Sequence, residues 1–184
     1  MTHKLPRVTE VIAHSFPGLV PDYELHTGSR VKCELGEEVH KLCKLVANKR
    51  ELPASPYYDY ARIFIRWLQE TRVEVLCSET KIKGSYRSLP YTGTPDMVVR
   101  WAGKTWVIDI KTGSTQPWHQ IQTAAYAWAW HNSCRTNLRD YLPRRAVLVL
   151  SAHGAKLTRF IDALDYRAWD ACLTYFYWAR RNLK

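Results

Sequence analysis

Apolar, β-branched and aromatic residues gather in three short segments near the middle of the chain. These segments cover residues 73–82, 94–101 and 104–111, and only Ala102 and Gly103 separate the last two. Short runs rich in β-branched and aromatic residues, bounded by Gly and Pro, are typical of strands. The tight Ala-Gly connection predicts a hairpin. The three segments together are therefore expected to form a β-meander.

Four longer segments place apolar residues three and four positions apart, which is typical of amphipathic helices. The first runs from about Lys32 to Lys49, although Gly36 weakens it, and the second follows the Pro/Ser punctuation of residues 53–56. The third is the Ala-rich stretch 116–132, and the fourth begins at Asp165. The apolar stripes of the first two helices are Leu35, Val39, Leu42 and Val46, and Tyr60, Ile63, Phe64, Trp67 and Leu68.

Two further apolar runs, 145–152 and 155–162, predict a hairpin that turns at His153 and Gly154. Residues 1–30 are punctuated by Pro and Gly and are expected to be mostly irregular, with a brief strand or helical turn in "RVTEVI". The resulting order is helices, three strands, a helix, two strands and a helix. This order predicts a single α/β domain over residues 1–184, with a central mixed β-sheet flanked by α-helices.

The charge of the chain narrows its expected partners. The formal net charge is +10 and the sequence pI is about 9.5. Such an excess of positive charge favours a polyanionic partner. Nucleic acid is favoured over a membrane surface because no basic amphipathic anchor is evident. A merely basic protein with no polyanionic partner is the simpler alternative. A basic loop, expected between the third helix and the second hairpin, adds to this charge.

Cysteine usage and hydropathy bear on the compartment. The five cysteines are scattered without a CxxC pair, which predicts reduced thiols rather than a disulfide framework or a zinc or iron–sulfur cluster. The first residues lack a long apolar run, and nowhere do 18 consecutive apolar residues occur. A cytoplasmic protein without membrane insertion is therefore expected. Its oligomeric state is left open.

The segment "WVIDIKTG" combines a buried strand pattern with charge. Side chains alternate along a strand, so Asp109 and Lys111 share one face while Ile108 and Ile110 share the other. Asp96 lies at the start of the neighbouring predicted strand, and pairing of the two strands would bring both carboxylates together. Two convergent carboxylates suit Mg²⁺, and an adjacent lysine can orient an attacking water or offset phosphate charge. An ion pair at a strand end, with Asp96 as a turn residue, is the alternative.

These residues resemble a known superfamily. Pro95-Asp96, twelve intervening residues and Asp109-Ile110-Lys111 resemble the PD-(D/E)XK nuclease signature. Gln122 and Tyr126 resemble the QxxxY motif of its RecB-like branch, and "LGEEVHKLCKL" is similar to the helix that presents a histidine, here His40. "LPRVTEVI" is similar to openings of phage-type members, so the resemblance extends to about residue 132. Four grouped cysteines and a helicase domain, found in some relatives, are absent from this sequence.

The resemblance implies a restriction-endonuclease-like core and Mg²⁺- or Mn²⁺-dependent hydrolysis of DNA. It implies three roles for the matched residues, namely metal binding, catalysis beside the scissile phosphate, and positioning of the strand or of the lysine. The metal ligands would be His40, Asp96, Asp109 and the carbonyl of Ile110; Lys111 would be catalytic; Gln122 and Tyr126 would position. Glu79 occupies the place of a further acidic residue, which supports a ligand, binds a second metal ion or is an exposed charge.

The resemblance also implies a biological setting. A stand-alone exonuclease that acts on DNA ends in phage or bacterial recombination and repair is expected, with a single-strand annealing or binding protein as a partner by analogy. Lys81, Lys83 and Arg87 are expected to line a basic cleft, and residues 83–92 either grip a single strand or form a solvated hairpin. A structure-specific endonuclease and a non-catalytic DNA-binding protein with the same fold are the alternatives.

Overall fold

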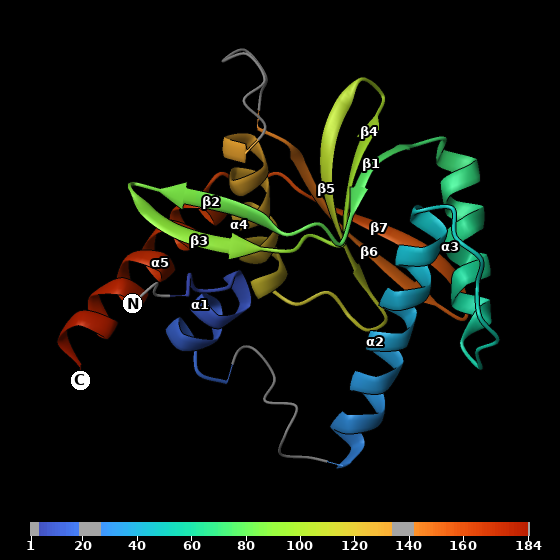
Figure 1. Ribbon diagram of the computed structural model, residues 1–184, viewed down its shortest axis with the longest axis horizontal. Coiled ribbons are helices and arrows are strands. Elements are labelled where there is room, and N and C mark those ends of the chain that lie inside the picture. The colour runs from blue at the N-terminus through green and yellow to red at the C-terminus, as the bar shows by residue number, and fades with distance from the viewer. Residues whose placement is uncertain (1–3, 19–26, 134–141, 184) are drawn as a thin grey trace.

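Five strands form a central sheet in the computed structural model, which describes residues 4–18, 27–133 and 142–183 (Figure 1). The order across the sheet is β1-β4-β5-β6-β7, and β5 and β6 are parallel whereas the other neighbours are antiparallel. The α/β class with a mixed central sheet is therefore confirmed. The strands are β1 (Glu74–Ser78), β4 (Met97–Trp101), β5 (Lys104–Lys111), β6 (Arg144–Ser151) and β7 (Gly154–Phe160).

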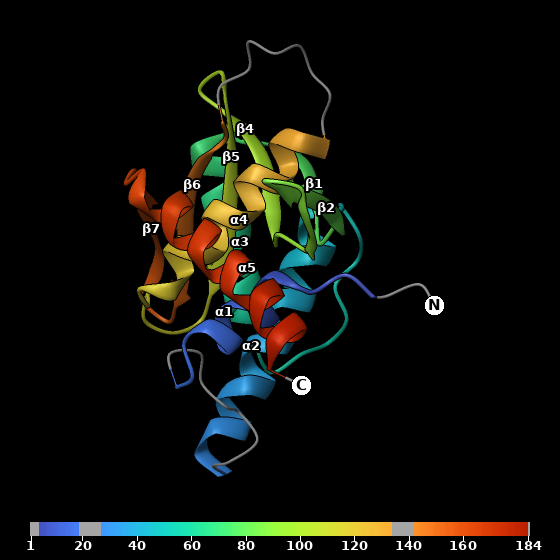
Figure 2. The same ribbon diagram turned by 90° about the vertical axis from the view of Figure 1, so that its left-hand side faces the viewer.

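Helices cover both faces of this sheet (Figures 1 and 2). On one face α2 (Thr27–Ala47) and α3 (Tyr58–Thr71) pack on alternate residues of β4, β5 and β6. On the other face lie α1 (Val8–Ser15), α4 (Trp118–Ser133) and α5 (Leu164–Asn182). No helix within the described ranges is long and apolar enough to cross a bilayer.

The predicted meander is confirmed, with one insertion. Its three strands pair in chain order as β1, β4 and β5, and the register shifts between Val75 and Cys77 of β1. The predicted strand 73–82 is wrong in its second half, because β1 ends at Ser78 and Glu79 takes a left-handed conformation with φ of 50°. The chain then forms a separate hairpin of β2 (Ile82–Tyr86) and β3 (Leu89–Gly93) before β4.

Two glycines let this hairpin lie directly on α4. A Cβ atom at Gly84 would be 2.6 Å from Tyr91 Cζ and 2.8 Å from Ala129 Cβ, and one at Gly93 would be 2.6 Å from the Tyr126 ring. The Tyr91 side chain is fully buried and its hydroxyl donates to the carbonyl of Ala125. Residues 83–92 are therefore a hairpin with one packed face, and neither a free loop nor a fully solvated one.

The mostly irregular segment expected over residues 1–30 is corrected in part, and the helical turn expected in "RVTEVI" is confirmed as the start of a longer helix. Helix α1 occupies residues 8–15 and buries Val8, Val11 and Ile12, and α2 begins at Thr27, earlier than predicted. The backbone N–H of Arg7 donates to Glu10 Oε2 at 3.3 Å, which stabilises the start of α1. The basic loop expected after α4 falls on residues 134–141, outside the described residues. So do Cys134 and the side chain of Cys33, whereas Cys43 and Cys172 are buried thiols.

A buried ion pair ties the last third of the chain together. Arg145 of β6 is 3% exposed, and its guanidinium lies 2.8 Å from Asp165 Oδ2 at the start of α5. The same guanidinium donates to the carbonyls of Gln120 and Asp162 and lies over the ring of Tyr166. Both terminal nitrogens of the Arg145 guanidinium thus have polar partners, which compensate for the removal of its charge from water.

Candidate metal-binding site

The register of β4 and β5 brings two carboxylates together. Met97 pairs with Ile108, and one further step of this antiparallel register places Asp96 opposite Asp109. The N–H of Ile110 donates to Asp96 Oδ2 at 2.6 Å. Asp96 is 9% exposed and Asp109 is 1% exposed. The expected convergence of the two carboxylates at one end of the sheet is therefore observed.

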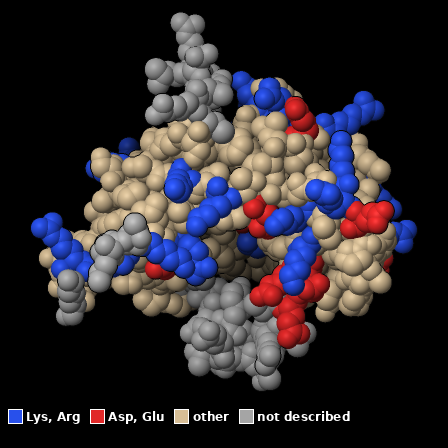
Figure 3. All heavy atoms as spheres, in the orientation of Figure 1, with Lys and Arg blue, Asp and Glu red and all other residues tan. Residues whose placement is uncertain are grey.

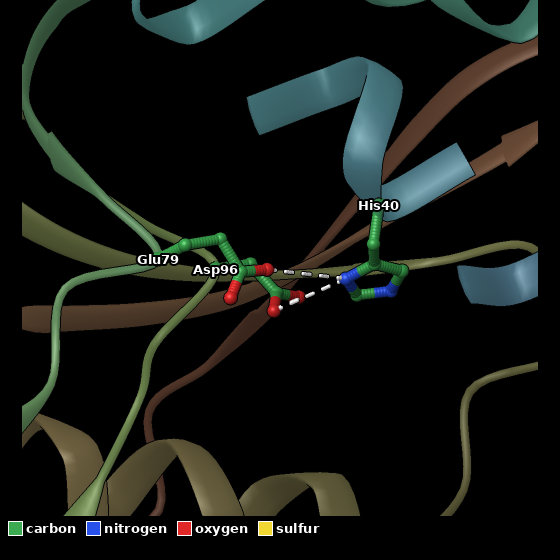
Figure 4. A group of neighbouring side chains, drawn as sticks. All are labelled: His40, Glu79 and Asp96. Carbon is green, nitrogen blue, oxygen red and sulfur yellow. Dashed lines mark ion pairs between the residues drawn. The ribbon is translucent and has the colours of Figure 1, made fainter. Parts of the chain in front are cut away.

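His40 and Glu79 join Asp96 from two other elements (Figure 4). His40 extends from α2, and its Nδ1 lies 3.2 Å from Asp96 Oδ1 and 3.7 Å from Glu79 Oε1. Glu79 is placed by the chain reversal that follows β1, where its N–H donates to the carbonyl of Asp96 at 3.1 Å. We call His40, Glu79 and Asp96 the metal cluster. Each offers one ligand atom, and these atoms lie within 4.8 Å of one another.

Asp109 lies beside the metal cluster but is not one of its members. Its Oδ2 is 2.6 Å from Lys111 Nζ, and the Lys111 ammonium lies 5.8 Å from the centroid of the Trp118 ring. The structure thus pairs Asp109 with Lys111, and Glu79 takes the third place beside His40 and Asp96. Because the N–H and carbonyl of a strand residue point to the same side, the Ile110 carbonyl faces the side of β5 on which Asp96 lies.

The charges of these residues compensate one another. Burial disfavours the imidazolium of His40, but Asp96 and Glu79 outweigh this and raise its pKa to about 10. Burial opposes ionisation of Asp96 as well, yet the His40 and Lys111 charges and the Ile110 N–H leave its pKa below the usual range. Burial raises the pKa of Asp109 to about 6, although Lys111 opposes the shift.

The donor set fits a divalent cation. His40 Nδ1 lies between two carboxylates, and its raised pKa favours the imidazolium there; an ion that displaced its proton would supply that positive charge instead. Carboxylate oxygens suit Mg²⁺ and Mn²⁺, and an imidazole nitrogen adds affinity for Mn²⁺ and later transition metals. The cluster is open to solvent on one side, since the His40 and Glu79 side chains are 26% and 25% exposed.

Gln122 and Tyr126 of α4 form a buried pair next to this site. Gln122 Nε2 donates to the Tyr126 hydroxyl at 3.1 Å, and both residues are 5% exposed. Burial raises the pKa of Tyr126, and the Asp109 charge adds to this. The ring of Tyr126 packs against Gly93, three residues before Asp96. Gln122 Oε1 is buried without a hydrogen-bond partner in the described part of the chain.

His119 also lies in this region, and the sequence analysis missed it. It is 2% exposed, and its Nδ1 accepts a hydrogen bond from the N–H of Gln116 at 3.0 Å, so Nε2 carries the proton. Burial lowers the pKa of His119 to about 3, and the Lys111 charge contributes. Its position three residues before Gln122 places both on one face of α4, which is the signal that would have found it.

The expected basic residues are only partly near the metal cluster. Lys81 and Lys83 are exposed on the segment that leaves Glu79. Arg87 lies at the far turn of the β2–β3 hairpin and pairs with Asp170 of α5 at 3.2 Å, so its placement in a cleft beside the cluster is corrected (Figure 1). Figure 3 shows Lys and Arg side chains around a hollow on one face of the molecule.

Comparisons with known proteins add little to this geometry. No protein-family model matches the chain, and no curated protein matches it. Sixteen solved chains match, among them one described as "Crystal structure of SSO0001", with 14% identity and a TM-score of 0.38. That alignment covers 64% of this chain and 58% of the other. Agreement at this level carries no argument about fold family or function.

Proposed function

We propose that this protein is a metal-dependent DNA nuclease whose site is of the PD-(D/E)XK type, within a restriction-endonuclease-like core, and that it acts as a RecB-like exonuclease. One observation carries the proposal. A histidine, a glutamate and an aspartate from three separate elements converge within 4.8 Å, and an aspartate–lysine pair lies next to them. The residues that converge are those that the motif resemblance selects.

The metal cluster would hold Mg²⁺ or Mn²⁺ through His40, Glu79 and Asp96. The Ile110 carbonyl and Asp109, which the resemblance implies as further ligands, lie beside it on β5. A bound divalent ion acts as a Lewis acid toward a phosphodiester and lowers the pKa of a bound water. The Ile110 N–H keeps one oxygen of Asp96 oriented, which leaves Oδ1 for the cluster. Asp109 holds the Lys111 ammonium at this end of β5, where it would neutralise phosphate charge.

The α4 residues would set the position of the lysine. Trp118 lies beside the Lys111 ammonium, and the Gln122–Tyr126 pair of α4 lies close enough to Asp109 for its charge to raise the pKa of Tyr126. Gln122 Oε1 keeps one unused acceptor in this buried region. A group that approaches the metal cluster with a donor could use it, as could the Lys111 ammonium after a small shift. DNA as the substrate is supported by the net charge of +10.

The experiment is a cleavage panel with labelled DNA. Linear single- and double-stranded substrates with 5′ or 3′ labels, and circular forms of each, are incubated with Mg²⁺, Mn²⁺ or EDTA. We expect metal-dependent loss of label from linear DNA only. Asp96→Asn and Lys111→Ala should abolish cleavage, whereas Lys104→Ala, at the opposite end of β5, should keep it. Cutting of circles would identify an endonuclease, and DNA binding without cleavage under any metal would reject the nuclease.

A further inference from the structure

The C-terminal half of α5 exposes aromatic rings that the core does not use. Tyr175 is 44% exposed and Trp178 is 53% exposed, while the opposite side of the same helix packs into the core through Trp169 and Leu173. The ring centroids of Tyr175 and Trp178 are 6.2 Å apart and their planes differ by 23°. His14, exposed on α1, lies 5.7 Å from Tyr175 at an angle of 32°. We call these three residues the aromatic row; the rings of Tyr175 and Trp178 are stacked, and that of His14 is tilted against Tyr175.

Positive charge accompanies the aromatic row. Arg180 and Arg181 follow Trp178 in the last turn of α5, and both are exposed. Residues 171–183 contain no Asp or Glu. The two acidic residues earlier in α5 are Asp165 and Asp170, and each is already engaged by an arginine from another element. No carboxylate in the described residues pairs with Arg180 or Arg181, so their charge is available to an anionic partner.

The row is held on a rigid support. Tyr177, on the neighbouring side of α5, donates from its hydroxyl to the carbonyl of Pro90 in β3. Ser15 at the end of α1 donates to the carbonyl of Cys172, which ties the two helices that carry the row. A preorganised surface loses little conformational entropy when it binds. The helices that carry the rings are therefore held in place against each other and against β3.

The combination of features distinguishes between kinds of partner. Arg, Trp and Tyr are enriched in protein interfaces as well, but the lack of Asp and Glu in residues 171–183 and the net charge of +10 favour a polyanionic partner. Arginines beside exposed rings are typical of surfaces that bind single-stranded nucleic acid. The bases stack on the rings and the phosphates pair with the arginines. A duplex hides its base faces and would use only the charges. Figure 2 shows α5 on the outer side of the helical layer, away from the sheet.

We propose that the aromatic row, together with Arg181, is a contact for single-stranded DNA that is separate from the metal cluster. This contact goes beyond the proposed cleavage, because it requires neither a metal ion nor Lys111. It would retain one strand at α5 without reading its sequence, since every base presents a π-face. The net positive charge of the chain would add affinity that falls as salt rises.

The test measures binding in EDTA, where no cleavage can occur. The probe is a fluorescein-labelled oligothymidine, and anisotropy is recorded with the full chain. We expect Trp178→Ala and Tyr175→Ala each to weaken binding by roughly 5- to 150-fold, the range for loss of one stacked base. Trp178→Phe keeps a ring and should retain most of the affinity. Ile161→Ala, which changes an apolar side chain that is 94% exposed just before α5, is the matched control.

Arg181→Ala is expected to lower both the affinity and the slope of its salt dependence, whereas the two ring variants should leave that slope unchanged. Arg167→Ala, an exposed arginine in the first half of α5, is the charge control. Equal affinities for wild type and ring variants would overturn the proposal, and so would equal binding of a hairpin duplex or no binding at all. A wild-type dimer that Trp178→Ala dissociates without loss of DNA affinity would assign the row to self-association instead. Because binding is measured in EDTA, an absence of cleavage in the labelled-DNA panel would reject the nuclease without affecting the test of the aromatic row.

Discussion

Asp96 Oδ2 accepts the N–H of Ile110 at 2.6 Å, while the other oxygen of the same carboxylate lies 3.2 Å from His40 Nδ1. One side chain thus fixes the end of β5 with one oxygen and faces α2 with the other. This double use links the architecture of the sheet to the metal cluster. A substitution at Asp96 has to be judged on both consequences.

Asp96→Asn should separate the two uses. The amide keeps an oxygen for the Ile110 N–H, so we expect the free energy of unfolding to fall by no more than about 3 kcal/mol. Wild type should melt at a higher temperature with Mn²⁺ than with EDTA, because an ion that binds only the folded state stabilises it. The variant should lose this Mn²⁺-dependent rise. Thermal unfolding followed by circular dichroism measures this rise, with Glu74→Gln as the exposed acidic control. If Mn²⁺ raised the melting temperature of Asp96→Asn as much as that of wild type, the assignment of Asp96 as a ligand would be contradicted.

Lys111→Met should destabilise the fold through Asp109. Asp109 is 1% exposed, and without the ammonium its charge has no neutralising partner at 2.6 Å. The expected loss is about 1–3 kcal/mol in urea unfolding. The double variant Asp109→Asn/Lys111→Met should lose less than the single lysine change, which a double-mutant cycle measures. Additive effects of the two substitutions would show that the pair does not interact.

Gly93→Ala should destabilise because its Cβ would lie 2.6 Å from two atoms of the Tyr126 ring. The ring is buried between the hairpin and α4, so it cannot move without opening the core. We expect a loss of about 1–3 kcal/mol, as for an overpacked interior. Gly113→Ala is the matched control, since nothing lies within 4 Å of its added atom. Urea midpoints compare the two variants, and similar values would contradict the packing argument.

Arg145→Met should be among the most damaging single changes in the chain. It leaves Asp165 without its guanidinium partner and the carbonyls of Gln120 and Asp162 without a donor. Removal of one member of a buried ion pair typically costs about 3–5 kcal/mol. Arg144→Met, at the adjacent exposed position, should cost far less. The free energies of unfolding in guanidinium chloride decide this, and equal losses would refute it.

The sequence located the strands better than it located the site. The bounds of β5 match the predicted segment 104–111, because its alternation and the Ala-Gly turn are local signals. The shared face of Asp109 and Lys111 follows from the same alternation. The sequence offered both Asp109 and Glu79 as acidic candidates, but not the choice between them, since Glu79 reaches the metal cluster through a left-handed backbone conformation that no glycine signals.

The missed elements have a similar cause. Helix α1 is only eight residues long, and its apolar face is stabilised by contact with α5, far along the sequence. The β2–β3 hairpin is short and polar on one side, and its stability comes from Gly84 and Tyr91 packing on α4. Both depend on tertiary contacts, which a window of local sequence does not contain.

The shift of register in β1 has a consequence for solubility. β1 and β7 are the two edges of the central sheet, and each leaves backbone groups on its outer side. The irregular spacing between Val75 and Cys77 interrupts the regular ladder of β1, and the exposed cations Lys156 and Arg159 lie on β7. Bulges and charged edge residues hinder strand addition. Edge-to-edge aggregation of this sheet is therefore disfavoured at both edge strands.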